Sequence, residues 1–308
     1  MSHPLLDLLS HMTVTEPKQS GGLQVFGLSH VQPASLEYRT LDEALAQSLL
    51  EVTEMTEGGS VPTLKLVNKS DGRVFLMAGE QLIGAKQNRV LNTSLMVAAH
   101  SEIPIPVSCV EQSRWSYRSR SFGSHGTSSH SKLRKVLCET VTSSYASTSM
   151  PTSDQGRVWG EVSRKLGAMG SHSDTMALEQ AYTDTKTDLD VFENALTVPE
   201  GAMGVVFALH GKIVGLDLFD QAGTLQKLWP KLLRAYAMDA MEPAGEAKPV
   251  ATRECVEVFV KHLRDVEPKQ FTSPGLGEDM RIESKELVGA GLVVESSMVH
   301  LQAFASEF

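Results

Sequence analysis

The sequence predicts an α+β fold with mostly antiparallel strands and segregated helices, in one large domain or two closely packed subdomains. Strand-like alternation dominates residues 20–112, and helical spacing of apolar residues recurs through much of 151–308. The elements come in blocks, without the regular strand–helix–strand rhythm of a doubly wound sheet. A chain of 308 residues is also long enough to bury a substantial core.

The composition excludes several classes of protein. A net charge of −9 argues against general nucleic-acid binding. The three cysteines show no CxxC spacing, which favours a reducing compartment over a disulfide framework or a cysteine-rich zinc site: Cys109, Cys138 and Cys255. The start lacks a secretory signal, and no run approaches 18 apolar residues. We therefore expect a cytoplasmic protein without membrane contact.

Residues 20–112 form the predicted β-rich half. A strand is expected at 22–28, after a Gly-Gly break. The spacing of leucine and alanine predicts a helix over 41–55, and Thr40 with Glu43 fits a capping box at its start.

Four further strands are expected in this half. Residues 62–70 and 71–82, separated by an Asp-Gly turn, predict a hairpin. Two more strands follow at 89–99 and 103–111. Prolines alternate with apolar residues in the last of these, which is typical of an edge strand.

Residues 113–150 differ from the rest in composition. The stretch is rich in serine and glycine, and from 113 to 135 it carries six basic residues and no acidic one. This composition predicts a mobile basic loop. A local basic patch in an acidic protein indicates an anionic ligand, and a solvated loop with incidental charge is the alternative.

Residues 151–308 form the predicted α+β half. Helices are expected at 154–166, capped by Ser153, and at 175–195, 224–241 and 251–265. Strand pairs are expected at 203–211 with 212–220, and at 286–297 with 298–306.

Familiar catalytic and cofactor motifs are missing from the sequence. It has no GxxxxGK[ST], no GxGxxG after a strand, no HExxH and no GxSxG. The histidines show no metal-ligand spacing. No metal and no cofactor are therefore expected.

Residues 79–115 place convergent polar groups among apolar strand residues, and we interpret them as the wall of a site. The candidate ligand-binding residues carry a cation, an amide or an aromatic ring: Lys86, Gln87, Asn88, Arg89, Asn92, Arg114 and Trp115. Cations suit phosphate or carboxylate groups, and amides suit polar groups such as a base edge. The alternative is a buried salt-bridge and amide network that braces a β-turn.

Three residues of this stretch are candidates for catalysis. Glu80 and Glu111 would orient the cations or act as general acid or base. Cys109 would be a nucleophile in a basic environment, although free cysteines more often pack in a core.

The stretch GEQLIGAKQNRVLNTS, followed by IPVSCVEQSRW, resembles the ADP-ribosylglycohydrolase- and rhodanese-phosphatase-associated protein domain family. Weaker similarities lie at 155–159 and 211–220, so the resemblance covers roughly residues 20–305. It implies a place in ADP-ribose or NAD-derived metabolism, and it carries over no mechanism.

These observations lead to two main hypotheses. The first is a protein that binds or processes an anionic nucleotide-type ligand such as ADP-ribose. The second is a non-enzymatic interaction protein whose polar cluster is structural and whose basic loop docks an acidic partner. A thiol enzyme built on Cys109 is a third possibility, and whether turnover occurs and the oligomeric state stay open.

Overall fold

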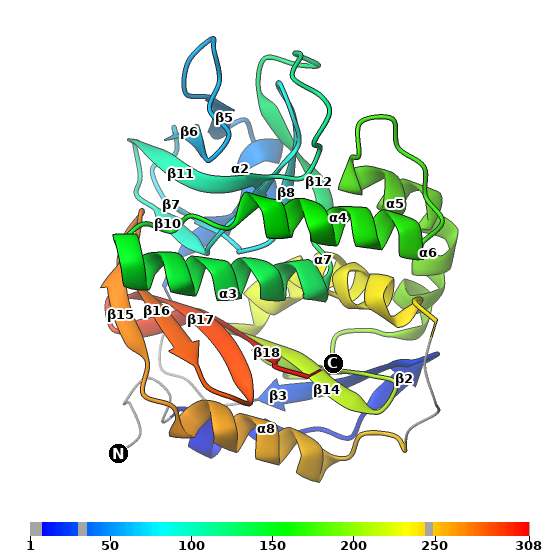
Figure 1. Ribbon diagram of the computed structural model, residues 1–308. Coiled ribbons are helices and arrows are strands. Elements are labelled where there is room, and N and C mark those ends of the chain that lie inside the picture. The colour runs from blue at the N-terminus through cyan, green and yellow to red at the C-terminus, as the bar shows by residue number, and fades with distance from the viewer. Residues whose placement is uncertain (1–7, 30–35, 244–248, 308) are drawn as a thin grey trace. The chain divides into compact units, whose positions relative to one another are not determined.

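The computed structural model describes residues 8–29, 36–243 and 249–307. Its strands are mostly antiparallel and its helices lie in separate blocks, which confirms the α+β prediction (Figure 1). The chain divides into two compact units. Unit 1 comprises Met1–Leu36, Asp188–Phe271 and Glu278–Phe308, and unit 2 comprises Glu37–Thr187 and Thr272–Gly277. This division cuts across the predicted halves at 20–112 and 151–308.

Unit 1 is built on a nine-stranded sheet with the order β1-β3-β13-β14-β18-β17-β16-β15, and β2 pairs with β3. Its strands are β1 Thr13–Val14, β2 Lys18–Ser20, β3 Leu23–Ser29, β13 Gly204–Leu209, β14 Lys212–Phe219, β15 Lys269–Thr272, β16 Glu278–Glu283, β17 Leu287–Val294 and β18 Ser297–Ala305. The antiparallel pairs β13–β14 and β17–β18 confirm both strand pairs predicted for the second half.

Helices cover both faces of this sheet. On one face α8 (Arg253–Asp265) buries Val256 and Leu263 in a core shared with the strands. On the other face α7 (Ala222–Ala240) stacks Tyr236 on Phe207, with ring centroids 3.8 Å apart. The 3-10 helix η1 (Leu8–His11) and helix α6 (Lys186–Ala195) complete the elements described around it.

Unit 2 contains two smaller sheets. One has six strands in the order β12-β8-β9-β11-β6-β5, and the other has three in the order β10-β7-β4. Their bounds are β4 Tyr38–Thr40, β5 Leu50–Glu54, β6 Thr63–Asn68, β7 Arg73–Leu76, β8 Glu80–Gly84, β9 Arg89–Leu91, β10 Leu95–Val97, β11 Ser101–Cys109 and β12 Phe122–Ser128. Its helices are α2 Leu41–Ala46, α3 Ser131–Thr148, α4 Gln155–Ala168 and α5 Leu178–Asp184.

The segment Thr272–Gly277 joins unit 2 by a close backbone approach. The Leu276 N–H donates to the Met96 carbonyl at 2.7 Å. A Cβ on Gly275 would lie 2.3 Å from the same oxygen, so only glycine allows this approach.

The helix predicted over 41–55 is too long. The capping box is confirmed, because Thr40 accepts from the Glu43 N–H and Glu43 Oε2 accepts from the Thr40 N–H at 2.8 Å. The helix ends at Ala46, and Ser48 takes a positive φ of 56°. The following residues alternate between buried and half-buried positions in strand β5, so a period of two replaces the helical one.

The hairpin predicted for 62–82 is wrong. Strand β6 pairs with β5 and β11, whereas β7 pairs with β4 and β10 in the other sheet. The Asn68 amide donates both to the Gly72 carbonyl at 2.9 Å and to the Ala98 carbonyl at 2.8 Å. These bonds fix a turn after which the chain enters a different sheet.

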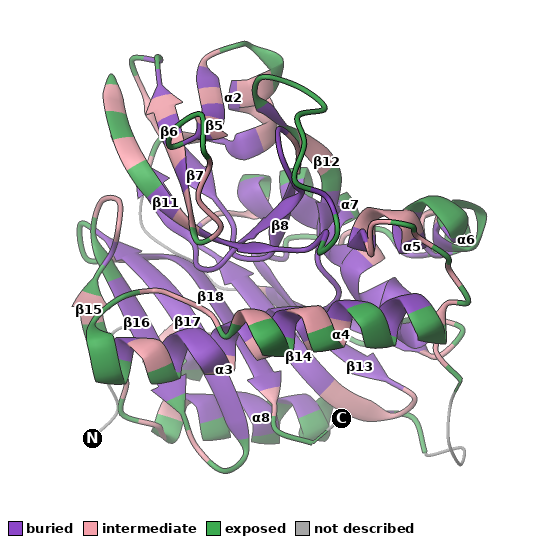
Figure 2. Cartoon of the chain, turned by 45° about the horizontal axis from the view of Figure 1, so that its top comes forward, coloured by how far each residue is buried: buried purple, intermediate pink, exposed green. Residues whose placement is uncertain are grey.

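The irregular loop predicted over 113–150 is wrong for most of its length. Residues 122–128 form β12, which pairs with β8. Residues 131–148 form α3, because Leu133, Leu137, Val141 and Tyr145 recur every fourth residue and are buried. The irregular part is shorter, and residues 115–121 within it are all exposed (Figure 2).

Three further elements of the structure can be compared with the predictions in detail. The N-cap of α4 is Asp154, which accepts from the Arg157 N–H, instead of Ser153. The helix predicted over 175–195 is divided into α5 and α6 at Thr185. The edge strand predicted at 103–111 is wrong as a whole, because β11 lies between β9 and β6 in its sheet. Only its first part, Ser101 to Pro106, pairs with β6 alone among the described strands, and both prolines lie in this part.

Candidate functional site

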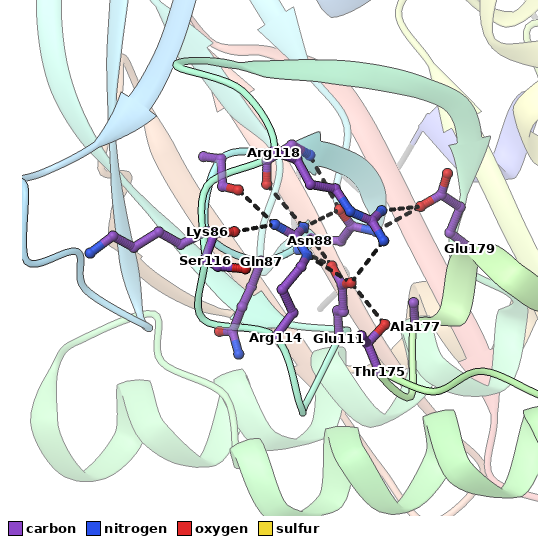
Figure 3. Close-up of polar contacts among 12 residues, drawn as sticks. Lys86, Gln87, Asn88, Glu111, Arg114, Ser116, Arg118, Thr175, Ala177 and Glu179 are labelled. Carbon is purple, nitrogen blue, oxygen red and sulfur yellow. Dashed lines mark hydrogen bonds and ion pairs between the residues drawn. The ribbon is translucent and has the colours of Figure 1, made fainter.

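The predicted site residues of unit 2 form a buried polar network around Glu111 (Figure 3). Glu111 Oε1 accepts from Arg114 Nε at 2.8 Å and from Thr175 Oγ1 at 2.9 Å. Its Oε2 accepts from Arg114 Nη2 at 2.6 Å and from the Asn88 N–H at 3.0 Å. Burial acts to raise the pKa of Glu111, but these hydrogen bonds outweigh it and hold the pKa below its ordinary value.

Arg114 is the donor that ties the network to the backbone. Its Nη1 donates to the carbonyls of Ala85 at 2.6 Å and Ser116 at 2.8 Å, and its Nη2 donates to the Gly84 carbonyl at 3.2 Å. The positive φ values of Gly84 and Ala85, 122° and 36°, mark the turn that it braces. Arg114, which follows β11, therefore stabilises this turn through its hydrogen bonds to the Gly84 and Ala85 carbonyls.

Asn88 extends the network to the helical part of unit 2. Its Oδ1 accepts from the Gly84 N–H at 3.2 Å, and its Nδ2 donates to Glu179 Oε2 at 2.9 Å. Glu179 lies in the first turn of α5. The turn after β8 is thus fixed from two directions.

Lys86 and Arg89 are also held within the protein. Lys86 Nζ donates to the carbonyls of Glu57 and Gly58 at 2.5 and 2.8 Å. Arg89 is fully buried, and its Nη1 donates to Gln87 Oε1 at 3.0 Å. Its Nη2 lies 4.0 Å from Glu54 Oε1, and burial lowers the pKa of Arg89.

The other candidate residues are enclosed as well. Glu80 Oε2 accepts from the Met77 N–H at 2.8 Å. Asn92 accepts from Ser108 Oγ at 2.5 Å and donates to the Pro151 carbonyl at 3.1 Å. The Cys109 sulfur is buried, and burial raises the pKa of its thiol although Arg89 acts in the opposite direction. We find these groups bonded inside unit 2 instead of lining an open site.

Trp115 is the exception among the candidates, with 47% of its surface exposed. Lys86 Nζ lies 5.3 Å from the centroid of the Trp115 ring and 5.1 Å from that of Tyr117. At these distances both rings attract the ammonium group through their negative faces. The exposed segment 115–121 is therefore anchored at its start to Lys86.

A groove of about 1110 Å³ opens beside this segment. It is lined by residues from β5, from the turn after β5, from β6 and from the exposed segment: Glu51, Thr53, Glu54, Thr56, Glu57, Lys65, Val67, Tyr117, Arg118, Ser119 and Arg120. We call it the β5 groove. Its volume lies slightly above the usual range of about 300–1,000 Å³ for small-molecule sites, and such sites are usually more apolar.

The β5 groove carries charges of both signs. Within the described part of the chain, the side chains of Arg120 and Glu57 have no ion-pair partner. Arg118 is 55% exposed and its Nη2 lies 3.7 Å from Glu111 Oε1, so it connects the groove to the buried network. Glu51 pairs with Lys69 at 2.6 Å, and that contact lowers the pKa of Glu51.

Sequence reasoning predicts only part of this groove. The basic run includes Arg118 and Arg120, but Glu51 and Glu54 fall within the helix predicted over 41–55. Alternation over Leu50–Glu54 is the signal that would have placed them on a strand.

No group of three metal-binding side chains occurs in the described residues. None of the described helices is both long and apolar enough to cross a membrane.

Comparison with known proteins gives one match. The family model described as "ARG and Rhodanese-Phosphatase-superfamily-associated Protein domain" matches residues 11–304. No curated protein and no solved structure matches the chain significantly.

Proposed function

The chain belongs to the family of ARG and rhodanese-phosphatase-superfamily-associated protein domains, and we propose that it binds an anionic nucleotide-type ligand such as ADP-ribose in the β5 groove. The family name records an association with ADP-ribosylglycohydrolases, which supports a context of ADP-ribose metabolism. The observation that carries the proposal is the groove itself, where a segment with two exposed arginines and an exposed tyrosine faces free volume.

Each part of the groove suits a part of such a ligand. Arg118 and Arg120 line the groove, and the planar geometry of a guanidinium group matches phosphate oxygens. The Arg118 guanidinium also lies 3.7 Å from Glu111 Oε1 and 3.9 Å from Glu179 Oε2, so a phosphate would compete with these carboxylates for it. The half-exposed ring of Tyr117 offers a face on which a base stacks. Glu57 offers carboxylate oxygens that accept from ribose hydroxyls.

We confine the proposal to binding. The candidate acid, base and nucleophile are at most 1% exposed: Glu80, Glu111 and Cys109. A general acid or base must come within hydrogen-bond reach of its substrate, and these residues lie inside unit 2. The buried network then serves to hold the segment that carries the arginines.

Calorimetric titration with ADP-ribose tests the proposal, with AMP and inorganic phosphate as comparison ligands. We expect micromolar binding of ADP-ribose, weakened about tenfold or more when Arg118→Ala and Arg120→Ala are combined, because each arginine supplies a charge-assisted hydrogen bond. Arg157→Ala is the matched control, since Arg157 is half-exposed on α4 and outside the groove. Absence of binding by the unaltered protein, or equal binding by the double variant, would reject the proposal.

A second candidate is the docking of an acidic protein segment on the same arginines. The observation that favours it is the absence of any acidic residue from 113 to 135, together with the exposure of residues 115–121. Fluorescence anisotropy with a labelled glutamate-rich peptide tests it. Peptide binding that depends on Arg118 and Arg120 and is not displaced by ADP-ribose would favour this candidate over the first.

A further inference from the structure

Arg118 lines the β5 groove and also lies near two carboxylates of unit 2. Its Nη2 is 3.7 Å from Glu111 Oε1, and its Nη1 is 3.9 Å from Glu179 Oε2. Both distances are too long for hydrogen bonds, so charge alone attracts the guanidinium to these carboxylates. Within the described residues, the Arg118 side chain makes no hydrogen bond. Its donors are therefore available to a ligand.

The backbone at Arg118 is fixed although its side chain is not. The Arg118 N–H donates to the Ala85 carbonyl at 2.9 Å, and the Ala85 N–H donates to Ser119 Oγ at 2.9 Å. The guanidinium stands at the end of a long side chain that is 55% exposed. It can therefore turn about a fixed Cα atom, either toward the carboxylates or toward a ligand in the groove.

The two carboxylates differ in how well their charge is already compensated. Glu111 is fully buried, each of its oxygens accepts two hydrogen bonds, and Arg114 supplies a cation to it. Glu179 is 26% exposed, and in the described part of the chain it has one further ion-pair neighbour, His125, at 3.9 Å. That neighbour carries a charge only when it is protonated. Arg118 is therefore the permanent counter-ion of Glu179.

Glu179 keeps its position whether or not Arg118 lies beside it. Asn88 Nδ2 donates to its Oε2 at 2.9 Å, and Asn88 Oδ1 accepts from the Gly84 N–H at 3.2 Å. A phosphate in the groove must therefore draw Arg118 away from a carboxylate that does not follow it. The apparent dissociation constant is then the intrinsic one divided by the fraction of molecules in which Arg118 faces the groove.

From these contacts we infer that Glu179 opposes the binding of anions in the β5 groove by holding Arg118 beside the buried network. The inference rests on the proposed function and adds a residue that regulates the same site. Glu179 is a positioning residue, because it acts through Arg118 and does not itself contact the ligand. Its charge sets how tightly the groove binds a phosphate.

Calorimetric titration of Glu179→Gln with ADP-ribose tests the inference. The substitution removes the charge and keeps an oxygen that accepts from Asn88. We expect the dissociation constant to fall about two- to fivefold, which is the effect of losing one exposed ion pair. Glu139→Gln is the matched control, because it removes the same charge from a half-exposed pair with Arg157 outside the groove. Its dissociation constant should equal that of the unaltered protein.

A second comparison isolates the route through Arg118. In the Arg118→Ala background, Glu179→Gln should leave the dissociation constant unchanged, since the cation that Glu179 holds is absent. A merely structural role of Glu179, or direct repulsion of the ligand by its charge, would give the same change in both backgrounds.

The outcomes separate this inference from the proposed function. If ADP-ribose binds the unaltered protein and binds Glu179→Gln equally or more weakly, the inference is wrong and the proposed function stands. If Glu179→Gln strengthens binding by the same factor with and without Arg118, the effect does not pass through Arg118 and the inference is wrong. If ADP-ribose does not bind the unaltered protein, both are wrong. Damage to the fold cannot produce the expected result, because it would weaken binding.

Discussion

Arg114 and Glu111 form a two-point ion pair inside unit 2, with Nε–Oε1 and Nη2–Oε2 distances of 2.8 and 2.6 Å. Both side chains are almost completely removed from solvent. A pair of this kind is stable only when its remaining donors and acceptors are satisfied. Here Arg114 also bonds three carbonyls and Glu111 also bonds Asn88 and Thr175. The pair therefore fixes the turn after β8.

We expect Arg114→Met to lower the free energy of unfolding by about 3–5 kcal/mol, because it leaves the Glu111 carboxylate buried without its cation. Urea unfolding monitored by circular dichroism measures the change. Arg157→Met is the control, since Arg157 contacts Glu139 in a half-exposed pair and should cost less than about 1 kcal/mol. Equal stability of the two variants would show that the buried pair is not structural.

The double variant Lys86→Ala with Arg89→Ala distinguishes a supporting network from a direct ligand contact. Lys86 bonds two carbonyls and Arg89 bonds Gln87, all within unit 2. Removing a hydrogen bond to a charged group typically costs about 1.5–3 kcal/mol, so we expect a combined loss of about 3–6 kcal/mol in unfolding free energy. Lys65→Ala with Arg120→Ala, which removes two cations that line the groove, should cost much less. A Lys86/Arg89 variant as stable as the unaltered protein would restore these residues as candidates for direct binding.

The polar cluster shows where sequence reasoning reaches its limit. The capping box of Thr40 and Glu43 and the pairs β13–β14 and β17–β18 depend on residues close in the sequence, and each was predicted. The wall of a site and a buried network have the same alternation of polar and apolar residues. The partners that decide between them come from far along the chain, because Thr175 reaches Glu111 and Glu179 reaches Asn88.

A different cause explains the error over 113–150, because the spacing of apolar residues in α3 is local. Serine, glycine and arginine predict an irregular loop, but serine and threonine also occur in helices when their hydroxyls bond the carbonyl four residues back. Thr140 and Thr142 of α3 do so, with the carbonyls of Val136 and Cys138 at 2.8 and 2.7 Å. The buried apolar positions, and not the polar ones, identify this helix.

Acid stability should depend on Glu161 of α4. Burial acts to raise the pKa of Glu161, but hydrogen bonds from Arg164 and His130, both at 2.7 Å, lower the pKa from 4.5 to about 2. The folded-state pKa is depressed, so the stabilisation is present above pH 4.5 and is lost as the pH falls toward 2. The shift in the pKa of Glu161 corresponds to about 3 kcal/mol of unfolding free energy.

Glu161→Gln should therefore flatten the decline in unfolding free energy between about pH 5 and pH 2, as measured by urea unfolding at a series of pH values. Glu200→Gln, at an exposed position, is the control. An unchanged pH profile in the Glu161 variant would contradict the role given to its contacts with Arg164 and His130.

Cys109 should resist alkylation in the folded protein. Its sulfur is buried, burial raises the pKa of its thiol, and the thiolate is the reactive form. Cys138 is also buried, whereas Cys255 is exposed on α8. We expect mass spectrometry after brief treatment with iodoacetamide to find modification at Cys255 alone, and modification of all three cysteines after denaturation. Rapid labelling of Cys109 in the native state would instead support a thiol enzyme, because it would require a sulfur that reaches solvent and ionises near neutral pH.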